Sequence, residues 1–470
     1  MKLCVLNGSP KGNKESITIQ YIYYSEQLFP EHNFELINVG QLLNNMRIQK
    51  ETFQQIIESL NSADGIIWAF PIYTTLIPAQ LKKFIELLFE DKKHQISDKY
   101  TICLSTSMKF FDTTAHNYMR AVCEDLGMKY SGYFSAHTYD FLDFEGRKKW
   151  YSFLNQFLEA IKEKQIVSKR FSPVEKRNFD YTPKIPPDSK KIGAENKNII
   201  ILTDCIDRNS NLFGMIERFR DCFIDKVQLY NFSEVEIKGG CLGCLKCGLD
   251  NNCVYNDEFS QLFEKVKNTD ILVCAGTITD RFLSSQWKLY LDRTFCNGHT
   301  PSMEGTQVCF LVSGPLSQNE NLREWMTATT ELGFGNLVDV VSDEFGDSTY
   351  IDNLIYHMAE SAVSLSDKNY ISPSTFYKEG GYKIFRDMIF DLPGALFRMD
   401  FKFFKERDMF DFPTRNWKGR ISRVFLSFCL KSKKFRKKFK KKLPSTLTAN
   451  FHKKLNDIDF DLERKKLKKQ

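Results

Sequence analysis

Two segments of 23 residues in this chain, 206 positions apart, follow the same pattern of apolar and polar positions. Residues 64–86 read DGIIWAFPIYTTLIPAQLKKFIE, and residues 270–292 read DILVCAGTITDRFLSSQWKLYLD. In both, a short apolar run precedes a segment with helical spacing, which is typical of a buried parallel strand and the helix that follows it. The repeat therefore indicates two tandem copies of one fold.

Strand and helix patterns alternate on both sides of each repeat. In the first copy the pattern predicts strands at residues 2–7, 34–39, 65–70, 100–105 and 130–136. In the second copy it predicts strands at residues 198–203, 227–232, 271–275 and 307–312. We expect an α/β protein with two doubly wound, parallel five-stranded sheets. The predicted parts are a domain at 1–165, a linker at 166–197, a domain at 198–366 with an insertion at 238–255, and a helical, aromatic and basic extension at 367–470.

Charge is unevenly distributed along the chain. The net charge is +7, but residues 420–470 hold 18 Lys and Arg against 4 Asp and Glu, so the rest carries −7. Only the tail could bind nucleic acid, and we expect no nucleic-acid partner. Residues 431–442 place nine cations around Phe435 and Phe439. This pattern could contact an anionic membrane surface; the alternatives are a solvated tail and an RNA-binding tail.

The sequence predicts a cytoplasmic protein, peripheral at the inner membrane face if the tail docks there. Its N-terminus has no long apolar run or small-residue cleavage site, and no segment approaches the ~20 apolar residues of a membrane span. The chain contains 13 cysteines. In a chain without an export signal, these are expected to be reduced thiols or metal ligands.

The first predicted strand leads into a loop suited to a phosphate group. Ligands of doubly wound sheets bind beyond the carboxyl ends of the strands, where a helix N-terminus offers free N–H groups. Gly8 allows close approach of the backbone, and Ser9, Ser16 and Thr18 add hydroxyl groups. The alternative is a Ser/Gly turn that only caps a helix.

A second loop follows the third predicted strand of the same copy. It begins Pro71-Ile72-Tyr73, and Pro78 opens the next helix. A flat aromatic ligand could lie on this turn while its phosphate occupies the first loop. The alternative is a simple connection in which Tyr73 has a packing role.

Together the two loops resemble the NAD(P)H-dependent FMN reductase and quinone reductase family. That family has a Gly-Ser-Pro…Ser-x-Thr phosphate loop and a Pro-x-Tyr…Pro/Ala-Gln-x-Lys flavin loop. The resemblance covers residues 1–165 and, with fewer matches, 198–345. It implies a flavodoxin-like fold, bound FMN and NAD(P)H as electron donor. The FMN-binding residues that it implies are Ser9, Lys11, Ser16, Ile17, Thr18, Pro71, Ile72, Tyr73 and Thr74. We assign no catalytic acid or base, because the flavin itself would supply the chemistry.

Four cysteines of the second copy have the spacing C-x2-C-x2-C-x5-C: Cys241, Cys244, Cys247 and Cys253. Such a compact run suits a [4Fe–4S] cluster, whereas zinc ligands more often form two separated pairs. Zinc and unligated thiols remain alternatives. The run also resembles that of iron–sulfur flavoproteins, in which four such cysteines hold a [4Fe–4S] cluster near FMN.

The second copy departs from the flavin pattern. Its phosphate loop lacks Gly-Ser-Pro and contains Asp204 and Asp207, which would repel a phosphate unless Arg208 compensates. Its flavin loop is Thr277-Ile278-Thr279, without Pro or Tyr. One interpretation is a division of labour, with flavin in the first copy and the cluster in the second.

These patterns predict a flavin-dependent oxidoreductase that passes electrons from NAD(P)H through FMN, and through a [4Fe–4S] cluster, to a quinone, flavin or protein acceptor. The main alternative is a non-catalytic electron carrier or redox sensor, docked to a membrane or partner by its basic tail. A third hypothesis is a cofactor-free scaffold. The sequence is also compatible with a homo-oligomer.

Overall fold

The computed structural model describes residues 1–412 apart from 92, 176–177, 185–189, 268, 391–393 and 395. Beyond 412 it describes residues 418, 421, 425, 428–429, 432–435 and 438. The chain divides into two compact units, Met1–Phe403 and Phe404–Gln470. Most of the basic segment 431–442 lies outside the described residues, so its membrane contact stays a prediction. Among the described helices, none is long and apolar enough to cross a membrane.

The first sheet has five parallel strands in the order β2-β1-β3-β4-β5. They are β1 (Lys2–Asn7), β2 (Asn33–Ile37), β3 (Gly65–Pro71), β4 (Tyr100–Ser107) and β5 (Lys129–His137). Its helices are α1 (Gly12–Glu15), α2 (Ile17–Leu28), α3 (Val39–Leu42), α4 (Lys50–Ser62), α5 (Ala79–Glu90), α6 (Asp112–Asp125), the 3-10 turn η1 (Asp140–Leu142) and α7 (Phe144–Lys162). All five predicted strands of this copy are present.

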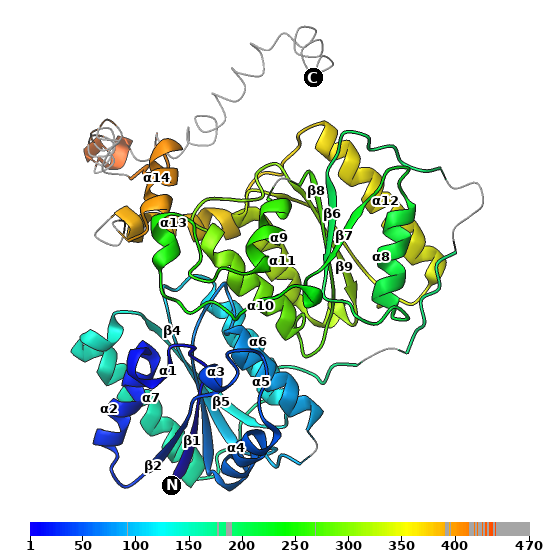
Figure 1. Cartoon of the computed structure of the whole chain (residues 1–470). Coiled ribbons are helices and arrows are strands. Elements are labelled where there is room, and N and C mark those ends of the chain that lie inside the picture. The colour runs from blue at the N-terminus through cyan, green and yellow to red at the C-terminus, as the bar shows by residue number, and fades with distance from the viewer. Residues whose placement is uncertain are drawn as a thin grey trace. The chain divides into compact units, whose positions relative to one another are not determined.

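The second sheet repeats the first (Figure 1). Its order is β10-β9-β8-β6-β7, again all parallel. The strands are β6 (Ile199–Thr203), β7 (Gln228–Asn231), β8 (Ile271–Thr277), β9 (Gln307–Ser313) and β10 (Asn336–Ser342). Numbered within each copy, both sheets have the order 2-1-3-4-5, which is the flavodoxin-like arrangement. The predicted fold class is confirmed.

The remaining elements belong to the second copy and the extension. They are α8 (Asn211–Asp221), η2 (Phe232–Glu234), η3 (Lys246–Leu249), α9 (Glu258–Val266), α10 (Ser285–Thr294), η4 (Phe295–Asn297), η5 (Leu316–Gln318), α11 (Glu320–Leu332), α12 (Ser348–Asp367), α13 (Phe376–Phe390) and α14 (Arg398–Glu406). The extension contributes the last two helices, as its pattern predicted.

Alternating apolar side chains explain how each sheet is covered. Leu3 and Val5 of β1 pack with α2 and α7, whereas Cys4 and Leu6 face the opposite side. In the second copy the corresponding outer face packs against α8 and α12. The two inner faces, with α4, α5, α6, α9, α10 and α11, share one hydrophobic core that extends through both copies. The two copies are therefore packed against each other through their inner helices.

The predicted linker is partly packed on the second copy. The Tyr181 hydroxyl donates a hydrogen bond to the buried Asp352 of α12, and Ile192 pairs with Phe223 as an isolated bridge.

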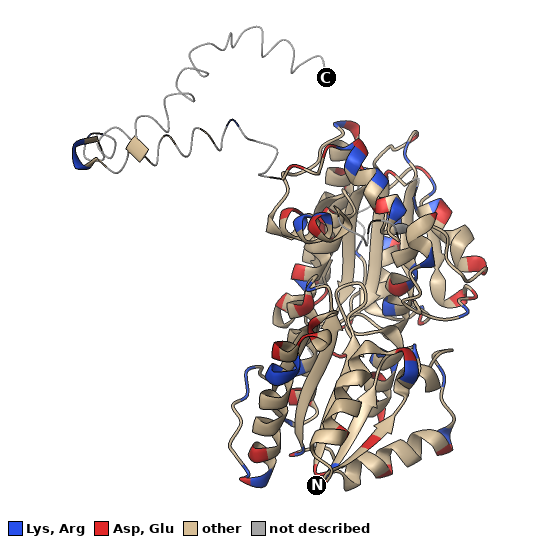
Figure 2. Ribbon diagram, turned by 90° about the vertical axis from the view of Figure 1, so that its left-hand side faces the viewer, with Lys and Arg blue, Asp and Glu red and all other residues tan. Residues whose placement is uncertain are grey.

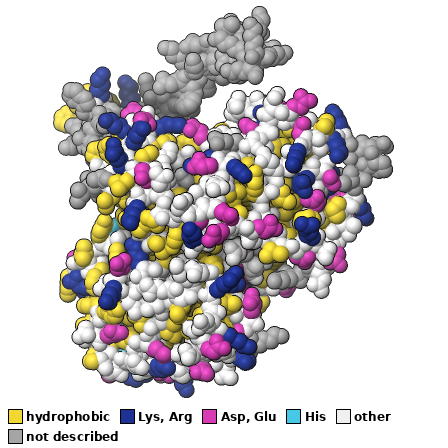
Figure 3. All heavy atoms as spheres, viewed as in Figure 1, with side chains coloured by type: hydrophobic (Ala, Val, Ile, Leu, Met, Phe, Trp, Pro, Cys, Tyr) yellow, Lys and Arg dark blue, Asp and Glu magenta, His cyan; other side chains and the backbone are white. Residues whose placement is uncertain are grey.

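Charged side chains of both signs are intermixed on the helices and on the molecular face shown (Figures 2 and 3).

Candidate functional site

The two copies meet with an approximate two-fold relation between α5 and α10. The N–H of Ala79, which begins α5, donates to the Asp292 carboxylate of α10 at 2.9 Å. Conversely, the N–H of Ser285, which begins α10, donates to the Glu86 carboxylate of α5 at 2.5 Å. Each helix thus supplies an anion to the positive N-terminus of the other, which stabilises both termini. The four residues occupy matching positions in the sequence repeat.

Two lysines of the repeat extend this relation. Lys82 donates to Asp280, which follows β8, at 2.6 Å, and both side chains are almost completely buried. Lys288 donates at 2.8 Å to the carbonyl oxygen of Tyr73, which follows β3. Lys288 therefore contacts the flavin loop of the first copy, and Lys82 contacts the equivalent loop of the second copy. The second copy consequently helps to hold the predicted flavin loop of the first.

The phosphate loop of the first copy is organised by Asn7 at the end of β1. Its side chain accepts a hydrogen bond from the N–H of Ser9 at 2.9 Å and donates to Asn38 at 2.9 Å. A methyl group at Gly8 would lie 2.6 Å from the Leu81 side chain, so the loop packs on α5 too closely for a larger residue. Ser9 is buried, and Lys11 is half-buried. The loop is thus held by hydrogen bonds and packing within the protein itself.

Ser16 has the free hydroxyl group of this loop. It is the N-cap residue of α2, is 3% exposed, and makes no side-chain capping hydrogen bond. Among the described residues, its hydroxyl oxygen has no hydrogen-bond partner. Buried polar groups are normally paired, and the first N–H groups of a helix also lack intrahelical partners. This combination fits an anionic oxygen bound at the start of α2.

Thr106 of β4 links the phosphate loop to the flavin loop. Its hydroxyl is 2.6 Å from that of Thr18, and its carbonyl oxygen accepts from the N–H of Ile72 at 3.2 Å. Pro71 ends β3, and Ile17 is 41% exposed at the start of α2. The predicted residues of the two loops therefore lie along one edge of the sheet. Thr106 is not among the site residues that the sequence predicted.

The flavin loop makes a sharp turn after Tyr73. Thr74 and Thr75 have φ values of 45° and 69°, which are unusual for β-branched residues and occur where the surroundings hold a strained backbone. The turn is closed by reciprocal hydrogen bonds between the backbones of Tyr73 and Leu76. The Thr74 hydroxyl donates to the carbonyl oxygen of Leu291 in α10. The conformation thus depends on the second copy as well as the first.

The cysteine loop, residues 238–255, is anchored by Arg293 near the end of α10. This buried guanidinium donates to Asp257 at 2.6 and 2.8 Å and to the carbonyl oxygen of Gly239 at 3.2 Å. Asp257 also accepts from the N–H of Lys238 at 3.0 Å. One buried ion pair therefore holds together both ends of the loop.

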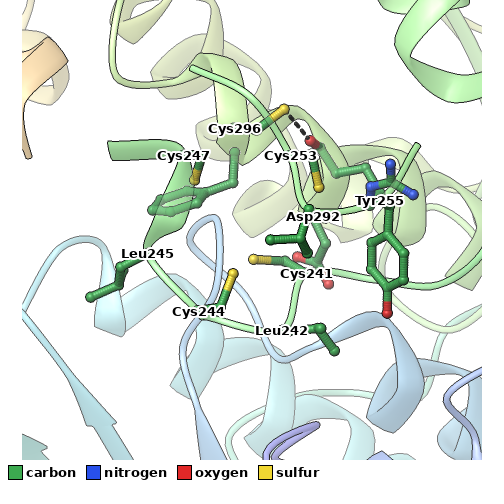
Figure 4. Close-up of a pocket in the computed structure, with 12 residues that line it drawn as sticks. Cys241, Leu242, Cys244, Leu245, Cys247, Cys253, Tyr255, Asp292 and Cys296 are labelled. Atoms are coloured by element: carbon green, nitrogen blue, oxygen red, sulfur yellow. Dashed lines mark hydrogen bonds between the residues drawn. The ribbon is translucent and has the colours of Figure 1, made fainter. Parts of the chain in front are cut away.

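The four motif cysteines and Cys296 line a single pocket, as Figure 4 shows. Cys247 is buried, Cys241 and Cys253 are half-buried, and Cys244 is exposed. Within the described part of the chain, no three His, Cys, Asp or Glu side chains are close enough to hold one metal ion. The predicted ligands therefore line the same pocket, but among the described residues no three of them are close enough together to bind one ion.

The thiols in this pocket differ in acidity. Burial, with the nearby Asp292 carboxylate, raises the pKa of Cys241 to about 12. A hydrogen bond from Cys296, together with the Tyr255 amide and Arg293, lowers the pKa of Cys253 to about 6 despite partial burial. Cysteines bind metals as thiolates, so binding of a metal to Cys241 would have to displace the proton of its thiol.

The cysteine loop lies directly on the flavin loop of the first copy. A methyl group at Gly243 would overlap the Tyr73 hydroxyl and lie 3.1 Å from Cε of Lys11. Burial raises the pKa of Tyr73, and negative charge at Cys241, Asp292 and Cys244 raises it further. The predicted flavin residues and the predicted metal ligands, about 170 positions apart, therefore form one site.

Gln80 of α5 is a site residue that sequence reasoning did not assign. It is fully buried, and among the described residues neither its amide nitrogen nor its amide oxygen has a hydrogen-bond partner. Its nitrogen lies 3.1 Å from the position of a methyl group on Gly240. Its place in the Pro/Ala-Gln-x-Lys pattern was the available signal.

In the second copy, the loop that corresponds to the phosphate loop is closed by its own side chains. Ser210, the N-cap of α8, accepts a hydrogen bond from the N–H of Phe213. Ser16 makes no such capping bond in the first copy. Asp204 is hydrogen-bonded to Ser284, and burial raises the pKa of Asp204. The N–H of Phe213 and the Asp204 carboxylate are therefore both satisfied within this copy.

Comparison with known proteins agrees with this geometry. Residues 1–139 match the model of the NADPH-dependent FMN reductase family. The first copy thus resembles that family, as its two loops predicted. An iron–sulfur flavoprotein of Archaeoglobus fulgidus is 29% identical over 65 residues, which cover 14% of this chain and 30% of that protein. The chain therefore matches less than a third of that relative's length.

Two solved structures are among the similar folds. An FMN-dependent NADH-azoreductase from Bacillus anthracis in complex with FMN is 16% identical, with a TM-score of 0.28 over 35% of this chain and 99% of that one. The flavoenzyme FerB, an NAD(P)H:acceptor oxidoreductase from Paracoccus denitrificans, is 16% identical, with a TM-score of 0.29 over 34% of this chain and 97% of that one.

Proposed function

We propose that this chain is a flavin-dependent oxidoreductase that takes electrons from NAD(P)H with FMN in its first copy. The electrons would then pass through a [4Fe–4S] cluster in its second copy to a quinone, flavin or protein acceptor. When bound, FMN accepts a hydride and can release the two electrons singly, which matches a one-electron cluster. The observation that carries the proposal is the contact of the cysteine loop with Tyr73 in the flavin loop.

The first copy fits FMN by its hydrogen-bonding capacity. The unpaired Ser16 hydroxyl and the free N–H groups at the start of α2 would hold the phosphate, with Lys11 supplying charge. The loop from Pro71 to Thr74 would support the flavin ring. The unpaired amide of Gln80, at the start of α5, would bond to a polar edge of the ring. The family match over residues 1–139 supports the same cofactor.

The cysteine loop fits a cluster better than a single ion. Its four motif cysteines have the compact C-x2-C-x2-C-x5-C spacing and line one pocket. In a [4Fe–4S] cluster each thiolate bonds to a different iron, so its ligands surround a wider space than zinc ligands do. The match to an iron–sulfur flavoprotein supports this assignment.

The second copy would act as a partner for the first copy's flavin site. Its own loop is occupied by Asp204, Ser210 and Ser284, and it offers carboxylates where a phosphate would bind. Its α10 instead holds the first copy's flavin loop through Lys288. This division assigns one flavin and one cluster to each chain.

Anaerobic purification with assays for flavin, iron and sulfide tests the proposal. We expect about one FMN and about four iron and four sulfide ions per chain. Cys247→Ser should lose iron and keep FMN, whereas the control Cys205→Ser, outside the pocket, should keep both. NADH and NADPH should each be assayed with a quinone and with free flavin.

Each alternative has its own result in this experiment. FMN without iron would restrict the protein to flavin chemistry, and a cluster without NAD(P)H oxidation would favour an electron carrier. A colourless protein after reconstitution with FMN, iron and sulfide would refute the proposal.

A further inference from the structure

Cys247 is in contact with a buried histidine that the proposed reaction does not use. Nε2 of His299 lies 3.2 Å from Sγ of Cys247, and Nδ1 of His299 lies 2.7 Å from Oδ2 of Asp400. The exposed fractions are 7% for Cys247, 3% for His299 and 9% for Asp400. A thiol, an imidazole and a carboxylate therefore form a continuous buried chain.

The three residues come from separate parts of the fold. Cys247 lies in η3 of the cysteine loop, His299 follows η4, and Asp400 belongs to α14 of the C-terminal extension. The imidazole contacts the rings of Phe295 and Phe397, at centroid distances of 5.2 and 5.7 Å. The ring is thus fixed in position by aromatic contacts as well as by its two polar neighbours.

The C-terminal extension also closes over the cysteine loop at a second point. A methyl group at Gly248 would lie 2.6 Å from the carbonyl oxygen of Leu396 and 3.3 Å from Cα of Phe397. Only a glycine permits this approach. The extension therefore packs on the loop next to Cys247 and, at the same time, presents Asp400 to His299.

The hydrogen-bonding roles follow from the groups on either side of the ring. A cysteine that ligates iron is a thiolate and has no proton to donate. Nε2 of His299 faces this sulfur at 3.2 Å, so the contact with a ligating Cys247 is a hydrogen bond when Nε2 carries a proton and donates it. A donor to a ligating sulfur stabilises the more negative, reduced state of the cluster.

We propose that His299, oriented by Asp400 of the C-terminal extension, is a positioning residue that donates a hydrogen bond to Cys247 and raises the reduction potential of the cluster. This inference rests on the proposed function, because it requires a cluster at the motif cysteines. It gives residues 396–400 a role in electron transfer that their sequence does not indicate. The electron acceptor would then be matched to a cluster whose potential the extension has set.

The test compares cluster potentials in His299→Phe, His299→Gln and Asp400→Asn with the unsubstituted protein. Phe can pack in the same aromatic surroundings but donates no hydrogen bond, whereas Gln retains a donor. The matched control is His357→Phe, because His357 on α12 is 71% exposed. Each potential is measured by anaerobic redox titration with electron paramagnetic resonance, after iron and sulfide analysis of the same sample.

We expect His299→Phe to weaken one-electron reduction of the cluster at least tenfold, which is a shift of about 59 mV to more negative potential. Asp400→Asn should shift the cluster potential in the same direction by less. The potential of His299→Gln should lie between those of the unsubstituted protein and His299→Phe. The control should match the unsubstituted protein, and the flavin potential should not change.

A loaded His299→Phe protein with an unchanged potential would overturn this inference and leave the proposed function intact. If that variant fails to fold or to load, an unchanged potential in Asp400→Asn would overturn it in the same way. An unsubstituted protein that binds no cluster would overturn both.

Discussion

Ser16 and Ser210 occupy matching places in the two copies, but the structure gives them opposite roles. Each is the N-cap of the first long helix after the first strand of its copy, α2 for Ser16 and α8 for Ser210. Ser210 caps α8 by accepting from the N–H of Phe213, whereas the hydroxyl of Ser16 has no partner among the described residues. Removing each hydroxyl should therefore have a different consequence.

Ser16→Ala should weaken FMN binding without weakening the fold. A hydrogen bond to a charged group contributes about 1.5–3 kcal/mol. At about 1.4 kcal/mol per factor of ten, the Kd for FMN should rise about 10- to 150-fold. The free energy of unfolding of the FMN-free protein should stay within about 0.5 kcal/mol, because no capping bond is lost.

Ser210→Ala should show the reverse. Loss of an N-cap hydrogen bond should reduce the free energy of unfolding by about 1 kcal/mol, and the Kd for FMN should not change. Flavin fluorescence titration of the FMN-free protein measures Kd, and urea unfolding measures stability. Unchanged FMN affinity in Ser16→Ala, or a stability loss equal to that of Ser210→Ala, would refute the reasoning.

Three further predictions concern the contact between the copies. Lys82→Met should destabilise the protein by about 3–5 kcal/mol in urea unfolding, because it leaves the buried Asp280 carboxylate without its cation. Adding Asp280→Leu should restore much of the loss, and a loss below about 1 kcal/mol in the single variant would contradict a buried pair. Gly243→Ala should lower the cluster content while FMN binding persists, because Gly243 has a φ of 62° and an added methyl group would overlap the Tyr73 hydroxyl. A normal iron content would show that the cluster does not require the contact between Gly243 and Tyr73. Removal of iron with a chelator should abolish electron transfer to a one-electron acceptor but leave flavin reduction by NAD(P)H, and equal loss of both would argue against separate sites.

The internal pairing of the two copies bears on assembly. The surface formed by α5 is covered by α10 of the same chain, with the reciprocal contacts of Asp292 and Glu86 at their N-termini. A homo-oligomer would therefore have to use another surface. Light scattering at several protein concentrations would show whether one forms.

Much of the fold could be predicted from local pattern. Apolar runs such as Gly65–Pro71 have to be buried on both faces, and the helical spacing after them leaves few arrangements besides a doubly wound sheet. The repeat identified the second copy, because two segments with the same buried positions need the same surroundings. The glycine and hydroxyl residues of the phosphate loop were compatible with a ligand or with a simple helix cap, and the flavin-loop pattern beside them favoured the ligand.

Contacts between distant residues could not be predicted in this way. Lys288 was visible as a repeat position, but its bond to the Tyr73 carbonyl exists only because the copies pack through their inner helices. His299 and Asp400 are 101 positions apart, and no local pattern pairs them. The sequence by itself determined the two sheets and the chemical types at their edges, since periodicity and residue chemistry act locally. Only tertiary packing decided that the cysteine loop of one copy lies on the flavin loop of the other, because that contact depends on the shape of the shared core.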